Sequence, residues 1–331
     1  MNKSVKTLEK ALQIHYLRPD NALWVYGIYK SVNKYLKKYT NRKYKSLDLG
    51  CGDGTTSFIA TGGEINEKFD VFLGTKFNKS NLKAMSDRSA SGSLRDAKGD
   101  LYDHFTKLYE KYCIPKLSKN KFTVGIDWKS SLLKKAELLK FYENLILKDC
   151  NKLPLNLKDN DFDLVFSTII YWLKKPDKIF PEVNRLLKRG GYFIFTTPKE
   201  KITELTLKNF LKKFNYKIIN RLDRGRHDNW KRHSKKKEYW EKILKKNNFK
   251  IIEVKEIHPN LQIIFGESII RTLISAFGVL YEQLLPKNEK LFFEFKKKYV
   301  KEMGIILKPF SNDKYYESLN KAYNVYIVRK K

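Results

Sequence analysis

Hydrophobic and polar residues alternate through the middle of the chain in a pattern that predicts short strands separated by helices. Short apolar-rich runs predict strands at Ser46–Leu49, Phe122–Asp127, Leu145–Cys150, Phe162–Ser167 and Tyr192–Pro198. Apolar residues at helical spacing predict helices over Lys129–Tyr142 and around Ile179–Leu187, the second capped by Gly190 and Gly191. Strands that alternate with helices predict a doubly wound α/β sheet, mostly parallel.

The ends of the chain complete this picture. Phe249–Glu256 predicts a sixth strand, and Tyr323–Lys330 predicts a seventh that pairs beside it, antiparallel, near the sheet edge. Residues 1–40 have helical spacing and predict an N-terminal helical segment, with Asp20 as an N-cap. We therefore expect a seven-stranded core over residues 41–331. Residues 62–121, 199–233 and 258–322 exceed minimal connections and predict helical cap insertions.

A glycine-rich turn follows the first predicted strand. Asp48 precedes the run Gly50-Cys51-Gly52-Asp53-Gly54, and a helical pattern comes after it. Glycines at such a turn let the backbone approach a ligand closely. The spacing differs from the phosphate-binding G-x-x-x-x-G-K-[ST] and from G-x-G-x-x-G. An acid at Asp48 would repel a diphosphate and suits a ligand with a positive amino group.

Acids also end the second and third predicted strands. A carboxylate at Asp127 can accept both hydroxyls of a ribose. Asp149, followed by the backbone N–H of Cys150, can accept from and donate to an adenine edge. The same acids could instead be helix N-caps. Taken together, they indicate a ligand with an amine, a ribose and an adenine but little negative charge.

The ordered series LDLGCGDG, GIDW, KDC, DFDLVFS and LLKRGGYFIFTTP resembles the class I S-adenosylmethionine-dependent methyltransferases. It covers about residues 45–198, with a late helix and strand near 238–256. The resemblance implies a Rossmann-like methyltransferase fold and S-adenosylmethionine as cofactor. It implies that Gly50, Gly52 and Gly54 line the methionine part, that Asp127 holds the ribose, and that Asp149 and Cys150 frame the adenine. Ser167 would lie near the sulfonium, with Cys51 and Trp128 in the same site.

Three further segments, YLRPDNALW, STIIYWLKKP and LDRGRHDNW, resemble parts of uncharacterised microbial methyltransferases of this class. Some of those proteins are thought to act on glycans or small metabolites. The resemblance makes substrate-site candidates of Arg18, Trp24, Trp172, Arg224 and Arg226. A helix-packing role for Trp172, and a solvated basic loop for the two later arginines, are the alternatives.

The sequence narrows the type of methyl transfer. No [DN]-P-P-[YFW] follows the fourth strand, and no Pro-Cys does, which disfavours the amino methyltransferases and a cysteine nucleophile. We expect O-, C- or N-methylation of a small-molecule, glycan- or lipid-linked acceptor. His227 and His233 are the candidate general bases because a neutral imidazole accepts protons near pH 7, and Tyr171 is a third catalytic candidate.

Charge raises a second hypothesis. The chain of 331 residues carries a net charge of +32, and residues 205–250 contain 16 basic against 4 acidic residues, interleaved with Trp230, Tyr239 and Trp240. An RNA methyltransferase could use such a face. Lysine supplies 56 of the 68 basic residues, which is also typical of composition bias or a solvated face. A third, non-enzyme hypothesis is an inactive binding subunit.

Cysteine usage and apolar runs bear on location. Three widely spaced cysteines exclude a disulfide scaffold and a thiolate zinc site, and they favour a reducing compartment. We find neither an apolar leader nor a run of 18 uncharged apolar residues, so we expect a cytoplasmic protein. We also expect no metal site. The apolar segment 263–286 predicts cap core, a peripheral membrane contact or a dimer contact.

Overall fold

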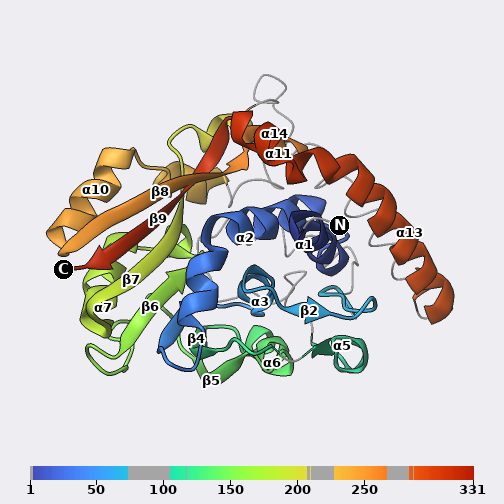
Figure 1. Cartoon of the computed structure of the whole chain (residues 1–331), viewed down its shortest axis with the longest axis horizontal. Coiled ribbons are helices and arrows are strands. Elements are labelled where there is room, and N and C mark those ends of the chain that lie inside the picture. The colour runs from blue at the N-terminus through green and yellow to red at the C-terminus, as the bar shows by residue number, and fades with distance from the viewer. Residues whose placement is uncertain are drawn as a thin grey trace.

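The computed structural model describes residues 3–73, 105–116, 118–206, 209, 227–266, 283–285 and 287–331. Its centre is a seven-stranded sheet in the order β5-β4-β1-β6-β7-β9-β8 (Figure 1). The strands are β1 (Ser46–Leu49), β4 (Phe122–Asp127), β5 (Tyr142–Leu147), β6 (Phe162–Ser167), β7 (Leu187–Pro198), β8 (Phe249–Pro259) and β9 (Lys321–Lys330). The first five run parallel, whereas β9 lies antiparallel between β7 and β8. This confirms the predicted doubly wound, mostly parallel sheet and the antiparallel last strand beside the sixth.

Helices pack on both faces of the sheet because successive strand residues point to opposite sides. Along β6, Leu164 and Phe166 belong to one apolar core, and Val165 between them belongs to the other. The first core also contains residues of α1 (Lys3–Ile14), α2 (Pro19–Tyr39), α3 (Thr55–Ala60) and α6 (Ser130–Leu138). The second contains residues of α7 (Ile179–Leu186) and α10 (Lys237–Lys246).

The N-terminal segment is helical, but the predicted N-cap is wrong. Pro19 occupies the first turn of α2, and Arg18 holds the cap position without a side-chain cap hydrogen bond. Proline suits this place because it has no N–H to leave unpaired. Asp20 therefore lies inside the first turn, where its carboxylate binds the guanidinium of Arg18.

The glycine C-cap predicted for α7 is also wrong. The helix ends at Leu186, and Leu187 is already extended as the first residue of β7, so Gly190 and Gly191 lie within that strand. Lys330 of β9 donates from Nζ to the carbonyls of Asn184 and Leu187, at 2.6 and 2.7 Å. A lysine thus satisfies the carbonyls at the helix end that a C-cap turn would otherwise satisfy.

The third strand begins and ends three residues earlier than predicted. It covers Tyr142–Leu147 instead of Leu145–Cys150, and α6 ends at Leu138 instead of Tyr142. The ring of Tyr142 stacks on Phe122 of the neighbouring β4, with centroids 6.0 Å apart, which starts the strand early. Asp149 accepts from the backbone N–H of Asn151 and turns the chain. This shift leaves Asp149 and Cys150 in the loop beyond the strand.

Smaller elements occupy the expected insertions. In the first, β2 (Glu64–Ile65) pairs antiparallel with β3 (Pro115–Lys116), after α5 (Lys107–Tyr112). The second contributes η4 (Ile202–Leu205), while η2 (Ile170–Trp172) and η3 (Pro176–Lys178) follow β6. The third contains α11 (Asn260–Phe265), the long α13 (Glu289–Leu307), η7 (Lys308–Ser311) and α14 (Asp313–Ser318). That these segments act together as a cap stays a prediction.

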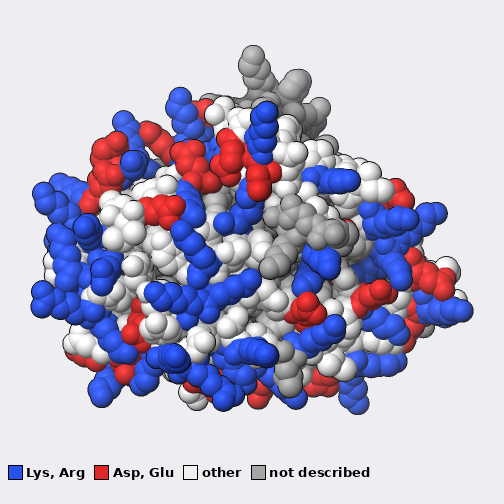
Figure 2. Space-filling view, in the orientation of Figure 1, with Lys and Arg blue, Asp and Glu red and all other residues white. Residues whose placement is uncertain are grey.

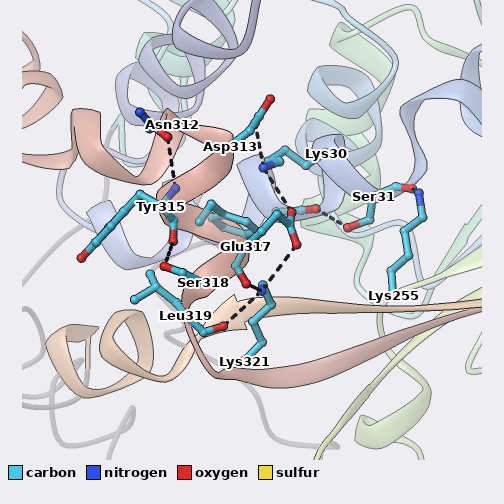
Figure 3. Close-up of polar contacts among 12 residues, drawn as sticks. Lys30, Ser31, Lys255, Asn312, Asp313, Tyr315, Glu317, Ser318, Leu319 and Lys321 are labelled. Carbon is cyan, nitrogen blue, oxygen red and sulfur yellow. Dashed lines mark hydrogen bonds and ion pairs between the residues drawn. The ribbon is translucent and has the colours of Figure 1, made fainter.

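Ion pairs fasten α14 to α2 (Figure 3). Lys30 of α2 contacts Asp313 at 2.9 Å and Glu317 at 3.6 Å, and Glu317 also contacts Lys321 of β9 at 3.6 Å. Lys255 of β8 donates to the carbonyl of Ser31 at 3.1 Å. These contacts hold α2 against the third insertion and against β8, the edge strand of the sheet.

A buried charge pair fastens α13 to the first insertion. Lys296 is 1% exposed and Asp70 is completely buried, with Nζ and Oδ2 3.4 Å apart. Lys296 also donates to the carbonyl of Phe69 at 2.7 Å, and Lys135 of α6 donates to that of Val71 at 3.1 Å. Two helices distant in sequence therefore converge on one loop through buried ammonium groups.

We expect Lys296→Ala to lower the free energy of unfolding by about 3–5 kcal/mol, because the Asp70 carboxylate then stays buried without its ion pair to Lys296. Urea unfolding measures this change. The exposed neighbour Lys298 is the control, since Lys298→Ala should change stability by less than about 0.5 kcal/mol. Equal stability of the two variants would show that the buried pair does not hold α13.

Candidate functional site

The glycine-rich turn after β1 has the backbone conformation that only glycine adopts easily. Gly50, Gly52 and Gly54 have φ angles of +75°, +60° and +75°. A Cβ on Gly50 would lie 2.2 Å from Cγ1 of Ile169, and one on Gly54 would lie 2.7 Å from the Tyr142 ring. A Cβ on Gly52 would meet nothing within 4 Å. Two glycines are thus required by packing, and the middle one faces open space.

That open space is a cavity of about 390 Å³ at the carboxyl ends of β1, β4, β5 and β6, which we call the glycine-loop cavity. Parallel α/β sheets bind ligands at this edge, and the volume falls within the range of small-molecule pockets. Six of the predicted cofactor residues line it: Gly50, Gly52, Asp127, Trp128, Asp149 and Cys150. The predicted substrate residue Trp172 lines it as well.

Asp127 ties two loops of this cavity together. One carboxylate oxygen accepts from the N–H of Gly52 at 3.0 Å, and the other accepts from the N–H of Lys129 at 2.9 Å. Burial raises the pKa of Asp127, and the hydrogen bonds from Lys129 and Gly52 oppose that rise. The side chain is 6% exposed and remains part of the cavity wall.

Four other predicted cofactor residues lie around the turn and are not among the cavity's lining residues. Asp48 accepts from the Tyr142 hydroxyl at 2.8 Å beneath the turn, and burial raises its pKa to about 6. Ser167 donates to the carbonyl of Leu49 at 2.8 Å. Cys51 and Gly54 belong to the turn itself, where Gly54 donates to the Cys51 carbonyl at 3.0 Å. Direct cofactor contact by these four stays a prediction.

The two thiols near the cavity are held in the protonated form. Burial raises the pKa of Cys150 to about 12, with further rises from Asp127 and Asp149. Burial likewise raises the pKa of Cys51 well above its usual value, and Asp48 adds to the effect. Thiolates are the nucleophilic form of cysteine. The electrostatics therefore disfavour a cysteine nucleophile here.

A second cavity of about 230 Å³ adjoins the first, and we call it the aromatic cavity. Asn21, Ile169 and Trp172 line both cavities. Its wall contains three of the predicted substrate residues, Arg18, Trp24 and Trp172, and the catalytic candidate Tyr171. Further lining residues are Asp20, Thr168, Trp230, Gln262, Ile263, Gly266 and Tyr323. Two adjoining cavities of this kind suit a cofactor and an acceptor whose reacting atoms must meet.

The walls of the aromatic cavity are preorganised. Arg18 binds Asp20 through two hydrogen bonds of 2.9 and 2.6 Å, so the positive and negative charges neutralise each other within the wall. Trp24 stacks on the buried ring of His258, with centroids 3.8 Å apart and planes inclined by 20°. Burial lowers the pKa of His258 well below its usual value, so this ring is neutral. The cavity combines aromatic faces with polar groups that are already fixed.

The two candidate histidine bases lie elsewhere. His227 Nδ1 is 3.1 Å from the hydroxyl of Thr206, and neither His227 nor His233 lines either cavity. Burial lowers the pKa of His233 to about 4. Tyr171 does line the aromatic cavity, and the Asn229 amide donates to its carbonyl at 2.9 Å. Arg224 and Arg226 lie outside the described residues. A catalytic role for any of these side chains stays a prediction.

In the part of the basic stretch 205–250 that the structure describes, most aromatic side chains are not available for stacking with bases. Trp240 is completely buried between α10 and the sheet, and Trp230 is 3% exposed and lines the aromatic cavity. Tyr239 is 38% exposed. Lysines of α10 remain on the surface (Figure 2), but two of the three interleaved aromatics belong to the interior.

Sequence reasoning missed two residues that line the glycine-loop cavity from the N-terminal segment, His15 and Asn21. The Asn21 amide nitrogen lies 3.3 Å from His15 Nδ1. Both lie in or beside the segment YLRPDNALW, whose resemblance pointed only to Arg18 and Trp24. No sequence pattern predicts that the end of α1 packs against the glycine-rich turn 35 residues later. The only signal for His15 and Asn21 was their position in or beside the segment YLRPDNALW.

A family model described as "Methyltransferase domain" matches residues 100–248. The match covers β4 to β7 and α10, and with them Asp127, Asp149 and Cys150. Residues 100–248 thus carry a methyltransferase domain, which agrees with the resemblance to the class I S-adenosylmethionine-dependent methyltransferases. The glycine-rich turn of this methyltransferase precedes the matched residues and joins them in the structure through the contact of Asp127 with Gly52.

Other known proteins resemble this methyltransferase more distantly. A malonyl-[acyl-carrier protein] O-methyltransferase of Marinomonas sp. (strain MWYL1) is 42% identical over 53 residues, 16% of this chain and only 19% of that protein. An S-adenosylmethionine-dependent methyltransferase from Mesorhizobium loti is 13% identical, with a TM-score of 0.43 over 91% of this chain and all of the other. Haemonchus contortus phosphoethanolamine N-methyltransferase 2 is 17% identical, with a TM-score of 0.40, over 94% and 57%. Such likenesses carry no inference about the acceptor.

The glycine-loop cavity fits S-adenosylmethionine. Open space above Gly52 admits a ligand close to the backbone, and Asp127, Asp149 and the N–H of Cys150 provide the acceptors and donor for a ribose and an adenine. Trp128 adds an aromatic face. Asp53, Asp127 and Asp149 in the lining disfavour a diphosphate, because they would repel it.

His15 provides a pH test of this wall. Burial lowers its pKa from 6.5 to about 4, so the unfolded chain binds a proton there at pH values where the folded protein does not. Stability therefore falls as the pH drops from 6.5 towards 4. We expect His15→Gln to flatten this part of the pH dependence of the unfolding free energy. Parallel curves for wild type and variant would show that His15 is not held neutral against the cavity.

Proposed function

We propose that this protein transfers a methyl group from S-adenosylmethionine in the glycine-loop cavity to a small acceptor in the aromatic cavity. The observation that carries the proposal is the common wall of the two cavities, formed by Asn21, Ile169 and Trp172. Proximity and orientation supply much of the rate of such a transfer. Because the same three residues line both cavities, the two ligands would bind as direct neighbours on either side of these residues.

Each part of the glycine-loop cavity has a distinct role in the proposal. Bound S-adenosylmethionine supplies a methyl group on a sulfonium, which is a good leaving group. Gly52 leaves room for the ligand, Asp127 accepts the ribose hydroxyls, and Asp149 with Cys150 binds the adenine edge. Asp48 supports the turn from below through Tyr142. Trp172 shields the junction of the cavities from water.

The acceptor we propose is a small molecule or the small end of a glycan- or lipid-linked intermediate. A volume of about 230 Å³ suits a discrete group more than a folded polymer. Stacked and edge-on rings of Trp24, Tyr171 and Tyr323 offer flat apolar contacts, while Gln262 and Thr168 offer polar ones. We keep Tyr171 as the candidate for proton exchange with an acceptor, because of the three predicted catalytic residues it is the one that lines this cavity.

RNA methylation is the second candidate function, and the exposed lysines of α10 favour it. Lys242, Lys245 and Lys246 form a basic face on that helix. Burial of Trp230 and Trp240 removes two of the three rings that would stack on bases. The small-acceptor proposal uses Trp230 where it lies, in the wall of the aromatic cavity.

Gly52→Val tests the cofactor site. We expect the variant to lose measurable binding of S-adenosylhomocysteine in titration calorimetry, because the side chain would enter the open space that the ligand needs. Gly62→Val is the matched control, since Gly62 also has a positive φ, +88°, but lies on the surface. Retained binding by a folded Gly52→Val protein would remove the turn from the site.

A labelling experiment separates the two acceptors. The protein is given S-adenosylmethionine with a radioactive methyl group together with the metabolite, lipid or RNA fraction of one cell lysate. We expect label in the metabolite or lipid fraction and its loss in Trp24→Leu, whose affinity for S-adenosylhomocysteine should remain that of the wild type. The triple variant Lys242→Glu, Lys245→Glu, Lys246→Glu should keep the activity. Label in RNA that disappears in the triple variant would establish the second candidate instead.

A further inference from the structure

The outer face of α13 carries exposed apolar side chains that the core does not use. Leu291, Phe295, Ile305 and Ile306 are 48%, 42%, 59% and 60% exposed. At 100° per residue these four positions fall within an arc of about 100° on the helix. The buried Phe292, Lys296 and Leu307 point to the other side. The helix therefore carries apolar side chains on two sides, of which only one packs on the protein, and Lys298 and Glu302 lie among those of the exposed side.

Lysines run along one flank of this apolar stripe. Lys290, Lys297, Lys301 and Lys308 lie within an arc of about 40° beside it, and Lys298 lies within the stripe; all five are exposed. Glu294 and Glu302 are the exposed acids of the same helix, and Lys297 pairs with Glu67 at 3.1 Å. Figure 2 shows Lys and Arg side chains, with some Asp and Glu side chains among them, over the end of the molecule that α13 borders in Figure 1.

A groove between α1 and α13 continues this face inward. Its volume of about 770 Å³ exceeds that of either cavity of the functional site. Val5, Val300 and Ile305 provide apolar lining, and Lys6, Lys301 and Lys308 are among the lysines of its wall. Ile305 and the last two lysines belong to the groove and to the α13 face at once. Glu9 and Glu67 also line the groove, but its six lysines outnumber them, so the lining suits an occupant that is both apolar and anionic.

We propose that the α13 face and the groove bind the surface of a membrane containing anionic phospholipids. Exposed aliphatic and aromatic side chains enter the boundary between headgroups and acyl chains, while lysines beside them attract the negative headgroups. The 19-residue helix lays this combination along about 28 Å of surface. Among the described helices, none combines the length and the apolar character that a membrane span requires.

Vesicle co-sedimentation of the full chain tests the proposal. Vesicles of phosphatidylcholine, with and without phosphatidylserine, are compared at physiological ionic strength. We expect binding only to vesicles that contain phosphatidylserine. Both Phe295→Ser/Ile305→Ser/Ile306→Ser and Lys298→Glu/Lys301→Glu/Lys308→Glu should weaken it at least about tenfold, because each removes one of the two attractions. The thermal unfolding midpoint shows whether each variant is folded.

Matched controls make the result specific to α13. Ile114, Leu147 and Ile252 are 60%, 59% and 42% exposed elsewhere, so their triple replacement by serine removes equal apolar exposure. The α10 variant Lys242→Glu/Lys245→Glu/Lys246→Glu removes equal charge. Both controls should bind as the wild type does. Absence of wild-type binding, equal losses in the control and α13 variants, or preference for an RNA oligonucleotide over the vesicles would overturn the proposal.

Discussion

The backbone of one turn constrains the whole functional site. Gly50, Gly52 and Gly54 all have positive φ angles, and the neighbouring Ile169 and Tyr142 side chains leave no space for a Cβ at the first and last of them. The middle glycine opens onto the cavity and is held by Asp127 from the neighbouring strand. The carboxyl ends of the parallel strands then bring Asp149 and Cys150 to the same edge. Without the glycine-rich turn, these acids would lie at the edge of the sheet but would not enclose a cavity.

The N-terminal helices turn this edge into two compartments. Residues between the end of α1 and the first turns of α2 reach both cavities, since His15 and Asn21 line one and Arg18, Asn21 and Trp24 line the other. The Arg18–Asp20 pair and the stacking of Trp24 on His258 fix that segment. Ion pairs from α2 to α14 hold it from behind. Helices that look like a packing appendage in the sequence are thus part of the site's wall.

The seven strands of the main sheet and its mostly parallel pairing were predictable, because strand patterns and the glycine turn are local signals. Errors arose where tertiary contacts overrode such signals: Tyr142 started β5 early through its contact with Phe122, and Lys330 replaced the expected glycine cap of α7. The cavity residues Gly50, Gly52, Asp127 and Asp149 followed from strand ends. His15 did not, because its place depends on how the N-terminal helices pack on the sheet, which no local spacing encodes.

A crystal structure of the protein with S-adenosylhomocysteine tests the central claim most directly. We expect ligand density in the glycine-loop cavity, with the ribose hydroxyls on the Asp127 carboxylate and the adenine between Trp128 and the loop of Asp149 and Cys150. We also expect the sulfur to face Trp172 and the aromatic cavity. Density at another place on the protein, or a ligand whose sulfur is separated from the aromatic cavity by protein, would contradict it.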